Sequence, residues 1–217
     1  KDVRNKLDLP IDKYEDLIET ILRECILEDP KWIFGSGFII EKSGFIITNH
    51  HVIERASSVF IRSNNNLDKA RIIIAESELD LALLKIDSSL PALPFQESAA
   101  KLSQTVFALG FPNPKEYGLA VSATEGTINS LTGHHDKMNH YQISTLVDKG
   151  FSGGPLIDEK GGGIVGVLVQ QYAANVKCAY AIKADALIHF LGRYPDLLNS
   201  IKYCSFRWAS REALIEQ

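Results

Sequence analysis

The chain has 217 residues, of which 45% are apolar, 23% charged and 9% aromatic, and its 23 Lys and Arg nearly balance 27 Asp and Glu. This is globular composition, long enough for one domain of about 200 residues or two smaller lobes. It excludes a disordered chain, collagen and a coiled coil. No apolar stretch approaches the roughly 20 residues of a membrane-spanning helix. Lys and Arg are not clustered, which excludes a nucleic-acid-binding surface.

The cysteines and the N-terminus bear on the compartment. Cys25, Cys178 and Cys204 are an odd set without CxxC spacing, which argues against a disulfide framework or a zinc knuckle. A reducing compartment is therefore favoured. The chain begins at Lys1 and shows no basic leader followed by an apolar block. We expect a cytoplasmic protein, or a periplasmic one if a leader has been removed.

Residues 1–30 carry the whole net charge of −4. Between Pro10 and Pro30 the apolar residues recur three and four positions apart, which predicts an amphipathic helix with an acidic outer side. This N-terminal helical extension is either a cover packed on the domain or a docking site for a regulatory domain or partner. The spacing does not decide between the two.

Residues 31–182 have the pattern of an all-β domain. Runs rich in Val, Ile, Phe and Thr, bounded by Gly, Asn, Asp or Ser, recur about every 10 residues without alternating helices, which indicates antiparallel barrels. The sequence predicts barrel 1 at about 31–90, a linker at about 88–103 that contains two prolines, and barrel 2 at about 104–182. Residues 183–217 form a C-terminal helical segment. The predicted strands are 38–40, 45–47, 59–61, 71–74, 81–86, 105–109, 119–122, 126–128, 141–145, 154–157, 164–170 and 178–182.

The sharpest chemical signal is a serine between glycines, in Gly150-Phe151-Ser152-Gly153-Gly154-Pro155. Glycines let a substrate backbone approach the Ser152 hydroxyl closely. The N–H groups of Gly150 and Ser152 could converge on an oxyanion, the charge that develops in acyl transfer. A serine needs a base to become a nucleophile. Without one, this segment is only a Gly-rich turn.

A base and a carboxylate are available elsewhere in the chain. Thr48-Asn49-His50-His51-Val52 follows a predicted strand, and two histidines in extended chain point to opposite sides, so only one faces a given cleft. Asp80 directly precedes an apolar strand, where a buried carboxylate needs a partner such as an imidazole. Each signal is weak alone. Their order along the chain, His, Asp and then Ser, is that of the chymotrypsin-type triad.

Further motifs identify a resemblance: the chain resembles a trypsin-like serine peptidase of the HtrA/Deg group. The match runs from about residue 33 to 191. The motifs that carry it are Gly35-Ser36-Gly37-Phe38, Thr48 to Val52, Asp80-Leu81-Ala82-Leu83-Leu84-Lys85-Ile86, Ala108-Leu109-Gly110-Phe111-Pro112, Gly126-Thr127-Ile128, Gly150 to Leu156 and Tyr180-Ala181-Ile182.

The resemblance implies a fold, an activity and residue roles. It implies two antiparallel β-barrels of chymotrypsin type, and a regulated endopeptidase that acts on proteins or peptides without cofactor or metal. His51, which directly precedes Val52, would be the general base rather than His50. Asp80 would orient the base, Ser152 would be the nucleophile, and the N–H groups of Gly150 and Ser152 would form the oxyanion hole.

One departure from the family pattern leaves an alternative open. The family commonly has Asn at the position of Phe151, and a phenyl ring supplies no polar anchor for the oxyanion loop. We therefore expect a resting site that is malformed until something binds. The alternative is a catalytically silent pseudopeptidase that acts as a protein-binding scaffold. The residues after 191 are too few for the PDZ module that usually follows, so peptide capture by that module is not expected.

The substrate pocket and a histidine-rich loop complete the expectations. In this fold Leu146 would form the base of the primary pocket, and Leu168 and Val169 one wall. Their apolar character predicts cleavage after small to medium aliphatic residues rather than after Arg or Lys. The loop from 131 to 141 contains His134, His135, Asp136 and His140. We expect a solvated loop there, with zinc binding as the alternative, because no fourth ligand is evident.

Overall fold

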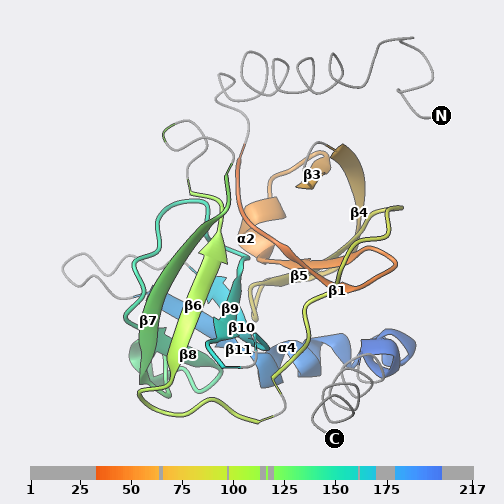
Figure 1. The fold of residues 1–217 in the computed structure, drawn as a ribbon. Helices are drawn as coiled ribbons and strands as arrows, with labels where there is room; N and C mark the ends of the chain where they lie inside the picture. The colour runs from red at the N-terminus through yellow and green to blue at the C-terminus, as the bar shows by residue number, and fades with distance from the viewer. Residues whose placement is uncertain are drawn as a thin grey trace, which may run out of the picture.

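The predicted all-β class is confirmed by a computed structural model, which describes residues 33–63, 66–96, 98–112, 116, 120–160, 162–169 and 179–201. Two barrel-like lobes stand side by side (Figure 1). The predicted N-terminal helix lies outside the described residues. At the other end, α4 (Ala184–Leu191) and a helical stretch at 195–201 follow the second lobe, as the sequence predicts. None of the helices in the described ranges is both long and apolar enough to cross a membrane.

The first lobe is an antiparallel sheet of five strands in the order β1-β2-β5-β4-β3. It curves into a half-barrel, because no pairing joins β1 to β3 within the described residues. A short helix, α2, follows β2. The elements are β1 (Phe38–Glu41), β2 (Phe45–Thr48), α2 (His50–Ile53), β3 (Val59–Ser63), β4 (Asn66–Glu76) and β5 (Leu81–Lys85).

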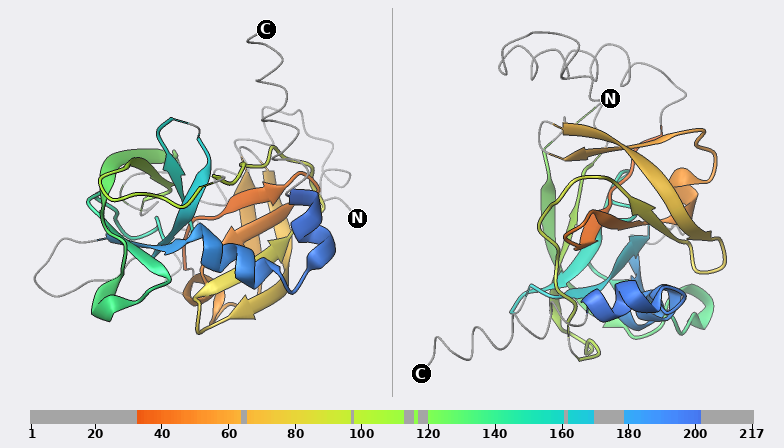
Figure 2. Two further views of the ribbon diagram at one scale, coloured as in Figure 1. Left: turned by 90° about the horizontal axis from the view of Figure 1, so that it is seen from below. Right: turned by 90° about the vertical axis from the view of Figure 1, so that its right-hand side faces the viewer.

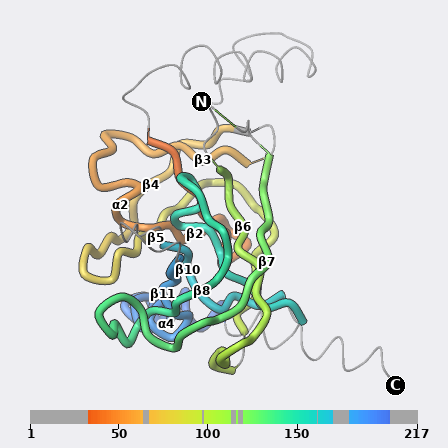
Figure 3. The backbone as a smooth tube through the Cα atoms, turned by 90° about the vertical axis from the view of Figure 1, so that its left-hand side faces the viewer, coloured from red at the N-terminus to blue at the C-terminus, as the bar shows by residue number. Residues whose placement is uncertain are grey.

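The second lobe is a closed barrel in the order β10-β11-β8-β7-β6-β9. Its antiparallel strands β6 and β7 form the long wall seen in Figure 3. The strands are β6 (Thr105–Gly110), β7 (Ser122–Ser130), β8 (His140–Ile143), β9 (Pro155–Asp158), β10 (Ile164–Val169) and β11 (Ala179–Lys183).

Strand β7 differs from the prediction of two short strands at 119–122 and 126–128. The chain continues through Gly126 as one strand. A Cβ atom at Gly126 would lie 2.6 Å from the backbone nitrogen of Thr145. Glycine therefore allows a close backbone approach here, and it does not mark a strand end.

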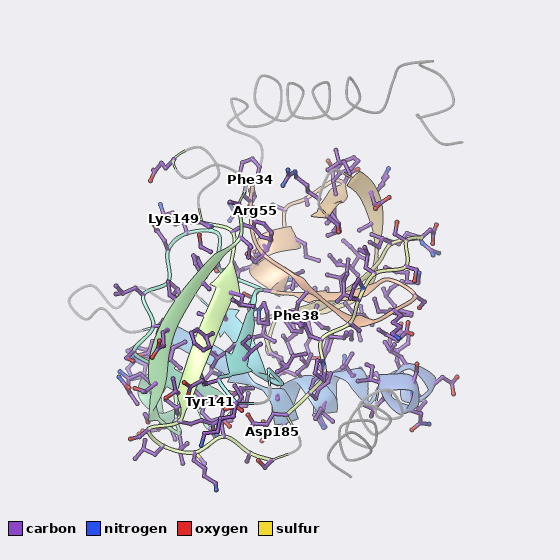
Figure 4. All side chains as sticks on the ribbon, viewed as in Figure 1. Phe34, Phe38, Arg55, Tyr141, Lys149 and Asp185 are labelled. Atoms are coloured by element: carbon purple, nitrogen blue, oxygen red, sulfur yellow. The ribbon has the colours of Figure 1, made fainter. Side chains whose placement is uncertain are left out.

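Three apolar cores hold the lobes. Two lie inside the individual lobes, whereas the third is shared, because Phe38 and Leu81 of the first lobe pack with Val167 and Ile182 of the second and with Leu187 of α4. Figure 4 shows Phe38 between the lobes, and Figure 2 shows α4, in blue, along their junction. Burying apolar area across a junction opposes separation of its two sides. The shared core therefore keeps the lobes in one relative position.

His140 lies buried at the start of β8, opposite Ile182 of β11. Its Nδ1 is 2.8 Å from Oδ1 of Asn139, and because an amide oxygen only accepts, the N–H at Nδ1 donates this hydrogen bond. The pKa of His140 is lowered to about 4, chiefly by burial and in smaller part by the charges of Lys137 and Lys183, while the charge of Asp80 opposes the shift. The folded protein therefore keeps this imidazole neutral at pH values where the unfolded chain protonates it.

This shift predicts acid sensitivity between pH 6.5 and about 4. The unfolded state binds the extra proton in that window, so the free energy of unfolding falls as the pH falls, by at most about 1.4 kcal/mol per pH unit from this group. Urea unfolding of the wild type and of His140→Gln at several pH values measures the effect. As the pH falls, the free energy of unfolding of the wild type should decrease more than that of the variant, because only the wild type carries this imidazole. An identical pH dependence for both would contradict the assignment.

Candidate functional site

The imidazole of His51 is held by Asp80 through two hydrogen bonds. The backbone N–H of His51 donates to Oδ1 of Asp80 over 2.9 Å, and Nδ1 lies 2.7 Å from Oδ2. Because a carboxylate only accepts, Nδ1 carries the proton, and Nε2 of the neutral ring is left as a base. The His51 side chain is 44% exposed, so the ring is oriented yet open to a ligand.

Backbone geometry explains why His51 meets Asp80. The two histidines begin the helical turn α2. They do not continue β2 in extended chain, the conformation considered from the sequence. Asn49, which is fully buried, donates from Nδ2 to the backbone oxygen of Asp80 over 2.9 Å. Asp80 has a φ of 54°, a left-handed conformation that Asp tolerates better than most residues. Sequence reasoning had given Asn49 no role, although it lies within the quoted motif.

The Ser152 loop lies against the start of α2. Ser152 is 6% exposed, and its backbone oxygen accepts from the N–H of Ser36 over 2.8 Å. Gly153 has a φ of 85°, and a Cβ atom there would lie 3.0 Å from the nitrogen of Asn49. Ser152 is thus next to the segment that carries His51. Within the described part of the chain, no hydrogen bond joins the Ser152 hydroxyl to the His51 ring.

The two amides expected to bind an oxyanion are the N–H groups of Gly150 and Ser152. Neither finds an acceptor among the residues that the structure describes. The carbonyl of Phe151 accepts from the N–H of Gly154 over 2.9 Å. In a trans peptide the N–H points away from the C=O. The Ser152 N–H therefore points away from Gly154.

Phe151 anchors the loop by burial. Its ring is 3% exposed and belongs to the core of the second lobe. A Cβ atom at Gly110 would lie 2.8 to 2.9 Å from three Phe151 atoms, so the ring packs directly on the β6 backbone. We had expected the lack of a polar anchor to leave the loop malformed. Instead, burial of the phenyl ring supplies an apolar anchor.

The three residues expected at the primary pocket lie in different surroundings. Leu168 and Val169 are buried in β10, at 1% and 4% exposure, whereas Leu146 is 68% exposed. Leu146 is therefore accessible at the surface of the second lobe. Its neighbour Val147 packs against the core of the second lobe. Alternation of side chains along an extended segment places the neighbour, not Leu146, on the inward side.

The histidine-rich loop holds no metal-binding cluster. No group of three or more His, Cys, Asp or Glu side chains that could hold a metal ion is found in the described ranges, which include residues 131–141. The rings of His134 and His135 lie with their centroids 3.9 Å apart. His140 is instead buried and bonded to Asn139. These side chains do not converge on one point.

Comparison with known proteins agrees with this geometry. Residues 35–167 match the model of the trypsin-like peptidase domain. A probable periplasmic serine endoprotease, DegP-like, from Rickettsia prowazekii is 34% identical over 199 residues, which are 85% of this chain and 36% of that protein. A relative of the same name from Hahella chejuensis is 30% identical over 168 residues, 75% of this chain and 35% of that protein. The periplasmic names give no support to the cytoplasmic location that we had favoured.

Solved structures show the same relationship. The serine endoprotease from Yersinia pestis matches with a TM-score of 0.63 and 28% identity, over 76% of this chain and 57% of that one. The active form of the Rv3671c protease from M. tuberculosis matches with a TM-score of 0.64 and 26% identity, over 73% and 72%. The chain spans little more than a third of the curated DegP-like relatives. On the family model, the sequence identities and the fold, this chain belongs to the trypsin-like peptidase domain family and is related to the DegP-like serine endoproteases of the HtrA/Deg group.

Proposed function

We propose that this chain is a serine endopeptidase that hydrolyses peptide bonds in proteins through Ser152, His51 and Asp80. The observation that carries the proposal is the doubly bonded His51–Asp80 pair next to the Ser152 loop. A side chain that orients the base and fixes its tautomer is the support that a serine nucleophile requires. Relatives named serine endoproteases support the same activity.

The three residues have distinct roles in the proposed mechanism. Oγ of Ser152 attacks the carbonyl carbon of the substrate while Nε2 of His51 takes the hydroxyl proton. The C–N bond then breaks, and the amine leaves with that proton, so that an acyl-enzyme ester remains. Water attacks the ester, gives a proton to Nε2, and the acid leaves as the proton returns to Oγ. Asp80 stabilises the imidazolium in both halves of the reaction.

The tetrahedral intermediates carry a negatively charged oxygen. We propose that the N–H groups of Gly150 and Ser152 donate hydrogen bonds to this oxygen. Support comes from the lack of an acceptor for either amide within the described ranges. Buried donors that are already oriented stabilise such an oxygen more than water does, because they need no reorganisation. No metal or cofactor has a part in this scheme.

We propose that the chain cleaves after small to medium aliphatic residues, with Leu146, Leu168 and Val169 near the primary pocket. The buried Leu168 and Val169 support an apolar wall. The exposed Leu146 offers apolar surface that a bound side chain could cover. The guanidinium of an Arg or the ammonium of a Lys would gain no charge partner from these three residues.

We also propose a periplasmic location and regulation through residues 1–30. The periplasmic names of the relatives support the first, and the acidic amphipathic pattern supports the second. Fractionation of cells that express the full-length gene tests the location, and recovery in the cytoplasm alone would contradict it. Equal activity with and without residues 1–30, in the presence of cell extract, would contradict the regulation.

Replacement of the nucleophile tests the activity itself. We expect Ser152→Ala to lower turnover of a protein substrate by about 10⁴-fold or more, because the acyl-enzyme cannot form. A fluorophosphonate probe should label the wild type at Ser152 and leave the variant unlabelled. A wild type that stays unlabelled and inactive, with or without added partners, would instead favour the pseudopeptidase scaffold. A variant that cleaves at the parent rate would contradict the nucleophile.

Removal of the carboxylate tests the orientation of the base. We expect Asp80→Asn to lower kcat on the order of 10⁴-fold, because an amide can hold the imidazole in the wrong tautomer. Asp87→Asn is the matched control: Asp87 is an exposed acid of the same lobe that pairs with Arg71 over 3.2 Å. The control should keep the parent kcat. Equal rates for all three proteins would show that Asp80 has no part in the reaction.

A peptide library tests the substrate preference. Sequencing of the cleavage products should recover Val, Ala, Ile and Leu most often directly before the cut bond, because these side chains fill an apolar pocket of moderate size. Cleavage chiefly after Arg or Lys would overturn the proposed pocket and leave the catalytic assignment intact.

A further inference from the structure

We propose that Ser36, in the first lobe, is a positioning residue that fixes the peptide between the two oxyanion donors of the second lobe. The inference rests on the proposed function, because it deepens the role of that loop. Ser36 lies just before β1 and is 5% exposed. Its sequence position, 114 residues before Gly150, gives no sign of the contact.

All the polar groups of Ser36 are engaged. Its Oγ donates to the oxygen of Gly150 over 2.6 Å and accepts from the N–H of Phe111 over 2.8 Å. Its N–H donates to the oxygen of Ser152 over 2.8 Å, and its own carbonyl accepts from Oγ1 of Thr48 over 2.7 Å. A hydroxyl with a donor and an acceptor bond cannot rotate without breaking one of them. Ser36 therefore joins three segments at fixed orientation.

The bond to Gly150 fixes one particular peptide plane. The plane between Gly150 and Phe151 has its oxygen on Ser36 and its N–H on the oxygen of Asp148, over 3.1 Å. A trans peptide is planar, so bonds at both ends define its rotation. This plane lies between the N–H of Gly150 and the N–H of Ser152. Its rotation therefore sets how those two donors are oriented relative to each other.

The second hydrogen bond of the same hydroxyl holds the backbone of Phe111, against which Gly150 packs. Gly150 has a φ of 103°, and a Cβ atom there would lie 2.2 Å from the backbone oxygen of Phe111. The N–H of that same Phe111 donates to the Ser36 hydroxyl. Loss of one oxygen atom would thus release both the Gly150 carbonyl and the segment that it touches. Two part-buried polar backbone groups, the carbonyl of Gly150 and the N–H of Phe111, would lose their partner.

This arrangement predicts an effect on the chemical step rather than on substrate binding. Oxyanion donors act on charge that is present in the transition state and absent from the bound substrate. Among the residues that the structure describes, no hydrogen bond joins Ser36 to His51 or Asp80, so the base keeps its own support. Removal of the Ser36 hydroxyl should therefore lower kcat and leave KM unchanged.

The experiment compares Ser36→Ala with Ser88→Ala. Ser88 is a part-buried serine of the same lobe whose hydroxyl donates to Asp68 over 3.0 Å. Ser88→Ala therefore also removes one hydrogen-bonded hydroxyl, but from a place outside the proposed site. We expect Ser36→Ala to lower kcat roughly 10- to 100-fold at unchanged KM. Affinity for a peptide boronic acid, whose boron hydroxyl occupies the oxyanion position, should fall by the same factor. Ser88→Ala should match the wild type in all three measurements.

Hydrogen exchange of the segment 147–156 is the second measurement and does not depend on activity. We expect faster exchange in Ser36→Ala, above all at the Phe151 amide, and wild-type exchange in Ser88→Ala. Unchanged kcat and boronate affinity, or a fall in kcat/KM that lies wholly in KM, would overturn the proposal. If the wild type itself neither cleaves nor binds the boronate, the proposed function fails. In that case exchange alone decides whether Ser36 positions the loop.

Discussion

The proposed site depends on a junction between two lobes, each of which holds part of the proposed triad. His51 and Asp80 belong to the first lobe, whereas Ser152 lies in the loop before β9 of the second. The shared apolar core keeps the lobes together. Hydrogen bonds from Ser36 of the first lobe to Gly150 and Ser152 of the second fix the position of the Ser152 loop. Apolar burial is strong and has little direction, whereas hydrogen bonds are directional. Together they give the rigidity and the orientation that a positioned nucleophile needs.

Local backbone geometry then fixes the side chains within that frame. A left-handed Asp80, held by buried Asn49, presents its carboxylate to both the backbone and the ring of His51. On the other side, Phe151 is buried in the barrel core, and the flanking amides of Gly150 and Ser152 have no acceptors in the described part of the chain. An apolar anchor therefore occupies the position where the family commonly has an amide. The loop can be ordered without a polar side chain at that position.

The sequence predicted the elements that depend on local pattern. Alternating β-rich runs predicted the all-β class, and motif order singled out the three residues that we propose as the triad. It did not predict the role of Ser36 or of Asn49, because bonds across 114 and 31 residues leave no local pattern. It treated Gly126 as the start of a separate strand, whereas the structure has one continuous strand in which this glycine allows a close backbone approach. The open edge of the first lobe depends on strand pairing, which composition does not encode.

A crystal structure of the complete chain with a peptide boronic acid tests the central claim most directly. The account predicts a covalent bond from boron to Oγ of Ser152, one boron hydroxyl hydrogen-bonded to the amides of Gly150 and Ser152, and the His51 ring still bonded to Asp80. It also predicts that the Gly150 carbonyl stays on Ser36. Boron bound elsewhere, or a His51 ring turned away from both Asp80 and the boronate, would contradict it.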